Sequence, residues 1–400
     1  MSRCPNCRLS HGRECGAVRS GSPDSGIGGV SAAAHLAPHG SVVLVEMESS
    51  LAYHTTGRSA SLLVVNYGGK GSVPLARASR SFLEDPPNYT IDVPLLSDRG
   101  ILWVADEFGL VDLEKFAEKG RASGAGSELI GPDEVSTLVP AMNRDYVAGG
   151  LYDPSARDID VAGLHQAFVR VARRYGAEIR TDSSVVGLRR QNGGWVVTTR
   201  TDTITCDVVV NAAGAWGDEI ARLAGIEPIG LQSMRRTVFT VPGHEEYAGW
   251  PMVVDVHHHF YFRPDGVQLL CSLAEEAPSA PTDPQPRMED IALAIERINQ
   301  ATTLDIRTVN SEWTGLRTFA PDRELVIGEE PNAKGFFWLV GQGGVGIMTS
   351  PAYGSLLASQ ILRQSLPKHL ADARVDPATT SPARFRHCRL GRIARRLFSR

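Results

Sequence analysis

The stretch GIGGVSAAAHL at residues 26–36, followed after a short turn by SVVLVE at residues 41–46, decides the fold class. Its first part is rich in glycine and alanine, and such small residues let a helix pack closely against a sheet. Its second part places four consecutive aliphatic residues before an acid, which is typical of a strand buried on both faces in a parallel sheet. The order of helix and then buried strand predicts half of a βαβ unit.

Two later stretches repeat this arrangement. CDVVVN at 206–211 runs into AAGAW, and GFFWLV at 335–340 runs into GQGGVG and an apolar helix. Between them, residues 229–275 alternate like antiparallel strands around a Pro264-Asp265-Gly266 turn, and residues 284–300 have the spacing of an amphipathic helix. The chain is therefore predicted to be an α/β protein, with a Rossmann-like nucleotide-binding domain and an inserted α+β domain built on an antiparallel sheet.

The composition excludes several classes of protein. A chain of 400 residues corresponds to about two or three domains. No apolar stretch approaches the roughly 18 residues of a membrane span, and six cysteines are too few for a disulfide-rich secreted scaffold. No basic and then apolar segment of a signal peptide opens the chain. With a net charge of −4, these features predict a soluble cytoplasmic protein without a transmembrane segment.

The C-terminal end is strongly basic. Seven arginines and no acid lie between Arg384 and Arg400. A basic tail is one signature of nucleic-acid binding, but only Phe385 and Phe398 interleave with these arginines. A solvated terminus is therefore favoured, and no nucleic-acid partner is expected.

The first glycine-rich turn resembles a dinucleotide-binding turn with one defect. Gly26 and Gly29 fit the second and third glycines of a Gly-x-Gly-x-x-Gly pattern, and Glu46 fits the acid that binds ribose hydroxyls. The first glycine position is Asp24, and residues 16–23 before it make a poor central strand. A carboxylate about 4 Å from a phosphate costs on the order of 4 kcal/mol. On the evidence of this motif alone, a glycine-rich turn that binds no ligand is an alternative to a dinucleotide-binding turn.

The following motifs, in this order, resemble the FAD-dependent amino acid oxidase/dehydrogenase (DAO) superfamily: YHTTGRSA at 53–60, NYG at 66–68, RASR at 77–80, YDP at 152–154 with DID at 158–160, NAAGAW at 211–216, WTGLR at 313–317 and GQGGVG at 341–346. The pattern covers about residues 25–386 and most resembles D-arginine dehydrogenases. It implies a discontinuous FAD-binding domain of the glutathione-reductase type at 24–90, 150–228 and 312–372. Residues 91–149 and 229–311 would form the substrate domain, 1–23 an irregular N-terminus and 373–400 a basic tail.

The resemblance also implies the cofactor and the reaction. The cofactor would be non-covalent FAD, because Gly315 stands about where covalently flavinylated sarcosine oxidases carry a cysteine. The reaction would be oxidation of an amino acid at its α C–N bond, with hydride passing to the flavin and the imine then hydrolysed to a 2-oxo acid and ammonia. Besides Gly26, Gly29 and Glu46, the cofactor-binding residues would be Arg58, Ser59, Ala60, Gly214, Gly343, Gly344 and Gly346.

Four residues would hold the substrate. Arg236 and Arg317 match the family's two carboxylate-binding arginines, and a guanidinium binds a carboxylate through two parallel hydrogen bonds. Tyr261 matches the tyrosine that joins them, and Tyr67 matches a tyrosine of the lid. Arg235 is interpreted as a surface charge.

Three consecutive histidines at 257–259 invite a metal interpretation. On the strand expected there, neighbouring side chains point to opposite faces, so no metal site is predicted.

Two pocket positions depart from the family. Ile101 and Leu62 stand where D-arginine dehydrogenases carry a glutamate and a histidine, which predicts a preference for apolar or small D-amino acids. Two alternatives stay open: an oxidase of N-methyl or glycine-type amines, and a flavin-poor, inactive protein of the same fold. The electron acceptor, oxygen or a quinone, also stays open.

The N-terminus suggests one further hypothesis. Cys4, Cys7, His11 and Cys15 approach the spacing of a zinc knuckle. The favoured interpretation is that residues 1–23 are foreign to the fold, through a wrong start or a frameshift, so no metal is expected.

Overall fold

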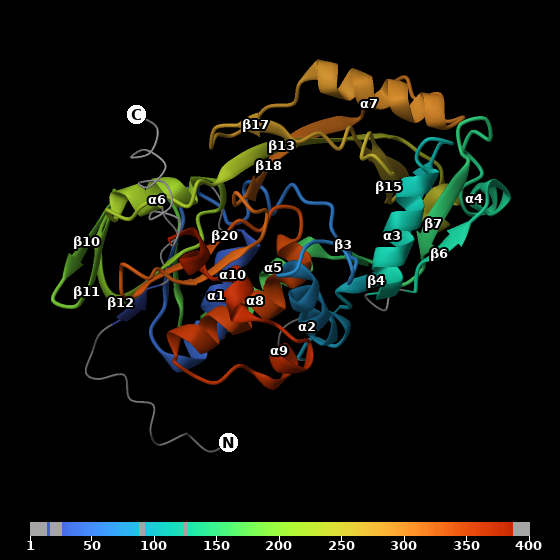
Figure 1. The fold of residues 1–400 in the computed structure, drawn as a ribbon. Coiled ribbons are helices and arrows are strands. Elements are labelled where there is room, and N and C mark those ends of the chain that lie inside the picture. The colour runs from blue at the N-terminus through green and yellow to red at the C-terminus, as the bar shows by residue number, and fades with distance from the viewer. Residues whose placement is uncertain (1–13, 17–25, 88–92, 123–125, 387–400) are drawn as a thin grey trace, which may run out of the picture.

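Two sheets form the framework of the molecule (Figure 1). The computed structural model describes residues 14–16, 26–87, 93–122 and 126–386. The first sheet has the strand order β10 (Val185–Gln191), β11 (Gly194–Thr199), β12 (Thr203–Asn211), β20 (Phe336–Val340) and β19 (Val326–Glu329), with β1 (Glu14–Gly16) beside β12. At its centre β12 and β20 are parallel, as predicted for two of the three buried strands. The third, β2 (Val43–Val45), is fully buried and pairs in parallel with β9 (Glu178–Arg180).

Strand β1 corrects one expectation about the N-terminus. Residues 1–23 were expected to be irregular, yet Glu14–Gly16 pair in parallel with β12. Asp24 and the rest of that segment, including Cys4, Cys7 and His11, lie outside the described residues.

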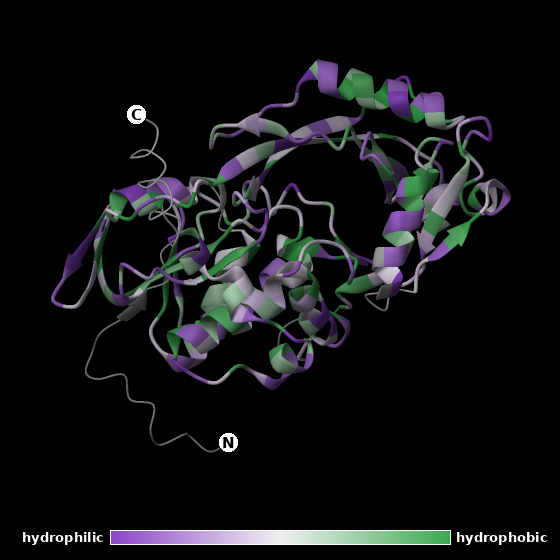
Figure 2. Ribbon diagram, viewed as in Figure 1, coloured by the Kyte–Doolittle hydropathy of each residue, from purple (hydrophilic) through white to green (hydrophobic). Residues whose placement is uncertain are grey.

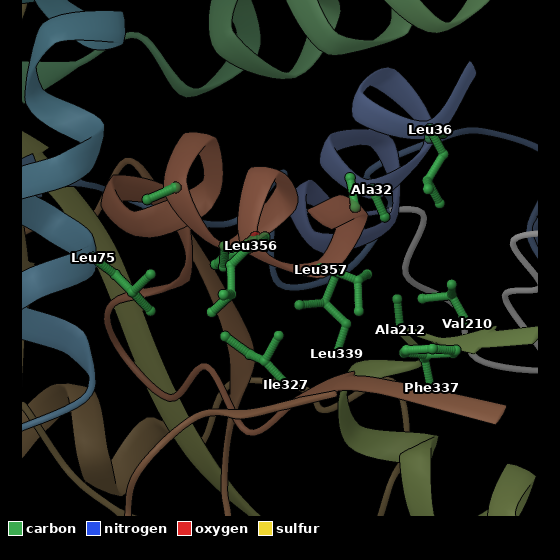
Figure 3. Packing of buried hydrophobic residues seen from close by; sticks show 14 of the residues in the cluster. Ala32, Leu36, Leu75, Val210, Ala212, Ile327, Phe337, Leu339, Leu356 and Leu357 are labelled. Carbon is green, nitrogen blue, oxygen red and sulfur yellow. The ribbon is translucent and has the colours of Figure 1, made fainter. Parts of the chain in front are cut away.

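The main core of this domain lies between the sheet and two helices. Helices α1 (Ile27–Leu36) and α8 (Gly346–Ile361) are apolar on nearly all sides, which suits helices that are buried. Figure 3 shows Leu356 of α8 directed toward Ile327 of β19 and Leu357 of α8 directed toward Leu339 of β20. A Cβ on Gly354 would lie 2.1 Å from the Ser31 hydroxyl, so the glycine permits the close approach of α8 to α1. Helices α2 (Ser72–Glu84), α5 (Val161–Arg174) and α6 (Gly217–Leu223) and the short helices η1 (Ala37–His39) and η2 (Gly214–Trp216) complete this domain.

The second sheet carries the inserted domain. Its order is β17 (Ala277–Ser279), β13 (Gln232–Pro242), β16 (Gln268–Ser272), β15 (Tyr261–Asp265), β14 (Met252–Asp255), β5 (Ile101–Ala105), β7 (Gly149–Asp153) and β6 (Glu128–Ile130), with β18 (Ser311–Phe319) beside β13. The predicted hairpin is confirmed as β15–β16, and the predicted helix as α7 (Met288–Ala301). Figure 2 shows α7 banded in hydrophilic and hydrophobic colours, as an amphipathic helix on a sheet should be. Helices α3 (Leu110–Ala122), α4 (Pro132–Leu138) and η3 (Glu245–Gly249) flank the sheet.

Two predicted domain boundaries and the predicted tail need correction. Strands β7 and β18 were assigned to the FAD-binding domain by the boundaries at 150 and 312, but both pair in the second sheet. A small sheet of β3 (Leu62–Leu63), β8 (Arg157–Ile159) and β4 (Leu96–Asp98) also joins segments of both assignments. Residues 373–386 are not a free tail.

That last segment packs on the body of the protein. It follows α9 (Lys368–Asp372) and contains α10 (Pro377–Thr380) and η4 (Pro382–Phe385). Arg384 pairs with Asp322 at 2.6 Å, and the buried Arg386 pairs with the buried Glu330 at 2.7 Å. The more distal arginines lie beyond the described residues. Among the helices of the described chain, none is long and apolar enough to cross a membrane.

Candidate functional site

Two helix N-termini of the Rossmann-like domain open into one cavity that strands of the second sheet also line. Gly26 precedes α1 and Gly346 begins α8, and both line this first cavity, which holds about 940 Å³ of space not filled by atoms. Eight of the ten predicted cofactor residues line it: Gly26, Arg58, Ser59, Ala60, Gly214, Gly343, Gly344 and Gly346. Gly29 does not; it is buried inside α1.

These helix ends suit an anionic ligand. The backbone N–H groups of a first helical turn lack intrahelical partners, and the helix dipole adds partial positive charge there. Neither α1 nor α8 has a side-chain cap or an acid in its first turn. One amide of α1 is already used, because Ile27 N donates to the Thr56 hydroxyl at 2.9 Å. The remaining first-turn amides can bind phosphate or a developing negative charge.

Glu46 lies at the carboxyl end of β2, where the dinucleotide pattern requires its acid. It is completely buried, and its Oε1 accepts a hydrogen bond from Glu48 N at 3.0 Å. Glu46 does not line the first cavity.

The predicted flavin-proximal segment is attached to the second sheet. The Thr55 hydroxyl donates to Leu316 O at 2.9 Å, and Arg58 Nη1 donates to Thr314 O at 2.8 Å. In return, Trp313 Nε1 donates to Arg58 O at 3.0 Å. These bonds couple the first cavity to β18, the strand that carries Arg317.

Arg236 and Arg317 lie on one face of the β13–β18 pair. Arg236 is directly opposite Gly315, and Arg317 is two residues further along β18. Residues two apart on a strand share a face, so the two long side chains point to the same side, and Gly315 leaves space between them. Both line the first cavity, together with the buried Tyr261 of β15.

The two guanidinium groups differ in how many of their N–H groups already have partners. Arg236 Nε donates to Glu275 O at 2.9 Å, and its Nη2 lies 3.6 Å from Glu276. Burial and the neighbouring Arg317 lower the pKa of Arg236 to about 10. Within the part of the chain that the structure describes, Arg317 has no hydrogen-bond or ion-pair partner, and its Nη1 lies beside Gly344. Arg317 is therefore available to bind an anion.

Arg235 is not the surface charge that was expected. Its exposed fraction is 6%, and its Nη2 donates to Gln285 O at 2.7 Å. Alternation along β13 turns it to the face opposite Arg236, where it holds the segment before α7.

A second cavity, with about 1400 Å³ of empty space, adjoins the first and shares Arg317, Gln342 and Gly344 with it. Tyr67 lines this second cavity, not the first. Aromatic side chains form part of the wall, and Glu276 and Arg323 form an ion pair at 2.8 Å in another part. The wall is thus more polar than the sequence predicts.

The two residues that led to the prediction of an apolar pocket, Ile101 and Leu62, do not lie in the pocket. Ile101 is buried in a core cluster that includes Tyr261, and Leu62 packs against the same cluster. Neither lines either cavity. These two positions therefore do not determine the polarity of the substrate space directly.

The three histidines lie in the turn between β14 and β15, not on a strand. The expected alternation to opposite faces therefore does not apply to them. His258 has a positive φ of 57° and lines the second cavity. Its pKa is lowered by partial burial of the ring and by the positive charges of Arg236 and Arg317, against the opposing effect of Asp255 and Glu276.

Several residues that line or support the two cavities were not predicted from the sequence. Glu276, Arg323 and Glu324 line the second cavity, but nothing in their local pattern marks them. Thr56 and Gln342 lie inside the motifs at 53–60 and 341–346, and their polar hydroxyl and amide groups could have identified them as candidates. Gln342 Nε2 donates to Leu339 O at 2.9 Å, which fixes the turn before α8.

A Rossmann-like domain with this cavity, beside an arginine-lined space on a second sheet, is typical of nucleotide-dependent oxidoreductases. The FAD dependent oxidoreductase (DAO) family matches residues 25–360, so the chain belongs to this family and is a flavoprotein that uses FAD. The match also establishes the predicted fold class, a Rossmann-like FAD-binding domain with an inserted antiparallel-sheet domain.

Sequence relatives include larger enzymes. Human mitochondrial sarcosine dehydrogenase is 27% identical over 285 residues, which cover 67% of this chain and 31% of the relative. Human mitochondrial dimethylglycine dehydrogenase is 27% identical over 377 residues, which cover 87% of this chain and 43% of the relative. The chain thus spans less than half the length of these curated relatives.

Solved structures share the fold across nearly the whole chain. L-proline dehydrogenase from P. horikoshii superposes with a TM-score of 0.79 at 21% identity, covering 94% of this chain and 98% of that one. Glycine oxidase from Geobacillus kaustophilus gives a TM-score of 0.78 at 21% identity, covering 88% and 95%.

The described residues fit FAD. The two uncapped helix N-termini offer donors for phosphate and for the flavin ring, and glycines at 343, 344 and 346 leave the cavity wall without side chains. A Cβ on Gly344 would lie 3.1 Å from Arg317 Nη1, at the point where the cavities meet. The position of Gly26, Gly343 and Gly344 on this wall agrees with the FAD contacts predicted for them, which stay predictions.

Proposed function

We propose that this protein oxidises an amino acid at the bond between nitrogen and the α-carbon. The observation that carries the proposal is the uncommitted Arg317 guanidinium, which borders both cavities and lies on the same face as Arg236. FAD, when bound, supplies the two-electron acceptor for the α-hydrogen. The final electron acceptor, oxygen or a quinone, stays open.

The arginines hold the substrate by its carboxylate. A carboxylate accepts two parallel hydrogen bonds from one guanidinium, which fixes both position and orientation. Orientation matters because transfer of the α-hydrogen depends on how the α-carbon is placed. Tyr261 lines the first cavity with both arginines, and Tyr67 lines the second cavity, which Arg317 also borders.

The same positive charges favour the reactive form of the amine. Oxidation at the C–N bond needs a nitrogen lone pair, which an ammonium group lacks. Arg236 and Arg317 disfavour a further positive charge nearby, so they lower the pKa of a bound amine. The chain's own residues thus bind and orient the substrate and favour the neutral form of its amine.

Two substrate classes are compatible with this site. The first is a D-amino acid with a primary amine, which gives a 2-oxo acid and ammonia. The second is an N-methylated or glycine-type amine, and the names of the two human relatives favour it. Substrate preference and a cytoplasmic location both stay predictions.

The test begins with the absorption spectrum of the purified full-length protein. A yellow protein whose flavin is released on denaturation supports non-covalent FAD. A colourless protein that FAD does not reconstitute would instead support the inactive alternative. Anaerobic bleaching is then compared for D-Ala, D-Leu, D-Met, D-Pro and D-Arg against glycine, sarcosine and N,N-dimethylglycine.

The products distinguish the substrate classes. Ammonia together with a 2-oxo acid identifies oxidation of a primary amine at its α-carbon, and D-Pro would give a cyclic imine without ammonia. Formaldehyde identifies oxidation at an N-methyl carbon, which would favour the second substrate class and overturn oxidation at the α-carbon. If none of these compounds bleaches a flavin-loaded protein, the proposed reaction is wrong.

A further inference from the structure

The turn between β14 and β15 gathers two imidazoles and a carboxylate at one place. Asp255, the last residue of β14, is 2% exposed, whereas His257 and His259 are exposed. One ligand atom from each of these three residues lies within 4.8 Å of the others. The imidazole ring centroids are 5.6 Å apart, and His259 Nδ1 lies 3.3 Å from Asp255 Oδ1.

The backbone of this turn brings the two histidines together. Asp255 Oδ1 accepts hydrogen bonds from His257 N at 3.1 Å and from His259 N at 3.0 Å. Between them His258 adopts a φ of 57°, a left-handed conformation that non-glycine residues adopt infrequently. This residue faces the second cavity, while its two neighbours meet outside it.

We propose that Asp255, His257 and His259 bind a divalent transition-metal ion. Two imidazole nitrogens and a carboxylate oxygen suit Zn²⁺, Ni²⁺, Co²⁺ or Cu²⁺. Bonds of about 2.1 Å in tetrahedral geometry place ligand atoms roughly 3.4 Å apart, so the imidazoles must approach by about an ångström. Exposed side chains can make this movement by rotation about χ1 and χ2, and solvent can complete the coordination.

A fourth residue supports one of the ligands. Asp112 of α3 has its Oδ2 3.2 Å from His257 Nε2. A carboxylate that accepts the second ring N–H of a histidine orients the ring and makes its other nitrogen a better metal ligand. The Asp112–His257 contact therefore leaves Nδ1 of His257 for the metal. The buried Asp255 is in turn held by Tyr146, whose hydroxyl lies 3.2 Å from Oδ2.

This proposal does not depend on the proposed reaction, and it can be tested by metal binding alone. The test uses the full-length, flavin-loaded protein, from which adventitious metal has been removed by a chelator. Because Cys4, Cys7, His11 and Cys15 could also bind zinc, the parent for the titration carries Cys4→Ser, Cys7→Ser and Cys15→Ser. Zn²⁺ binding to this parent is measured by calorimetry.

One equivalent of Zn²⁺ is expected to bind to the parent. His257→Ala combined with His259→Ala should weaken that binding at least tenfold. The control is His244→Ala, which replaces an exposed histidine just before η3 and should leave Zn²⁺ binding unchanged. Flavin content and the unfolding midpoint show that each variant is folded. Absence of Zn²⁺ binding to the parent, or equal binding by the double variant, would overturn the proposal.

Discussion

The carboxylate of Glu324 accepts a hydrogen bond from the backbone amide of Lys70 at 2.8 Å, although the two residues are 254 positions apart. Its second oxygen accepts the amide of Gly71 at 2.9 Å. The loop held in this way continues from Tyr67, and Gly69 passes so close that a Cβ there would lie 2.1 Å from Glu324 Oε1. Glu324 therefore fixes the loop that borders the second cavity.

Removing this carboxylate should loosen the loop and weaken substrate binding. Hydrogen bonds to a charged group contribute about 1.5–3 kcal/mol each, less where solvent competes. For Glu324→Ala we expect KM to rise by roughly tenfold, with a smaller change in kcat. Steady-state kinetics measure both constants. Glu312→Ala, at an exposed position of β18, is the matched control, and an unchanged KM in Glu324→Ala would show that the loop does not contribute to binding.

Arg317 should tolerate even a conservative replacement poorly. Arg317→Lys keeps the positive charge but loses the two parallel N–H donors that a carboxylate accepts. The loss of about 1.5–3 kcal/mol predicts a fall in kcat/KM of roughly 10- to 100-fold, with the flavin spectrum unchanged.

The control for this replacement is Arg307→Lys, because Arg307 pairs with Asp305 on the surface. Kinetics with the best substrate of the bleaching panel provide the measurement. If Arg317→Lys retained full kcat/KM, the substrate's carboxylate would have to bind elsewhere.

The sequence was most informative where short motifs coincide with strand ends. The glycine turns at 26–29 and 341–346 mark the helix N-termini of the first cavity, because both the tight turn and the ligand contact need glycine. Arg236 and Arg317 could be found from their motifs, and the strand register explains why they share a face.

Other features depend on tertiary contacts that local sequence does not encode. The turn at 257–259 was predicted as a strand, since nothing in three consecutive histidines reveals the reversal at His258 or its fixation by Asp255. The burial of Arg386 against Glu330 was likewise hidden, because its partner lies 56 residues earlier in the chain. Ile101 was expected to line the substrate pocket, but its side chain packs in the core cluster that includes Tyr261, a tertiary contact that the local sequence does not reveal.

Gly343 should be irreplaceable because it combines backbone strain with a lack of space. Its φ is 53°, and a Cβ would lie 2.4 Å from the ring of Phe319. Gly343→Ala should therefore displace the turn before α8 and strongly reduce flavin content. Gly176→Ala is the control, because Gly176 has a φ of 85° but nothing within 4 Å of its Cβ position.

The Gly176→Ala control should lose only about 1–2 kcal/mol of folding stability, because alanine is disfavoured in a left-handed backbone conformation. It should keep its flavin. The flavin-to-protein absorbance ratio and the urea unfolding midpoint measure the two effects separately. Equal flavin content in both alanine variants would contradict the assignment of the 341–346 turn to FAD.

His54 should make the folded protein sensitive to mild acid. Its side chain is 4% exposed, and burial together with the positive charge of Arg58 lowers its pKa to about 4, against the opposing effect of Asp283. The unfolded chain binds a proton near the ordinary histidine pKa of about 6.5, so stability falls as the pH decreases from about 6.5 to about 4. The shift corresponds to a loss of at most about 3 kcal/mol. Urea unfolding of the flavin-loaded protein at about pH 7.5 and about pH 5 should show a smaller difference for His54→Gln than for the parent or for His244→Gln. An undiminished difference in His54→Gln would assign the acid sensitivity to other buried groups, of which His35 is the first to replace, because burial lowers its pKa as well.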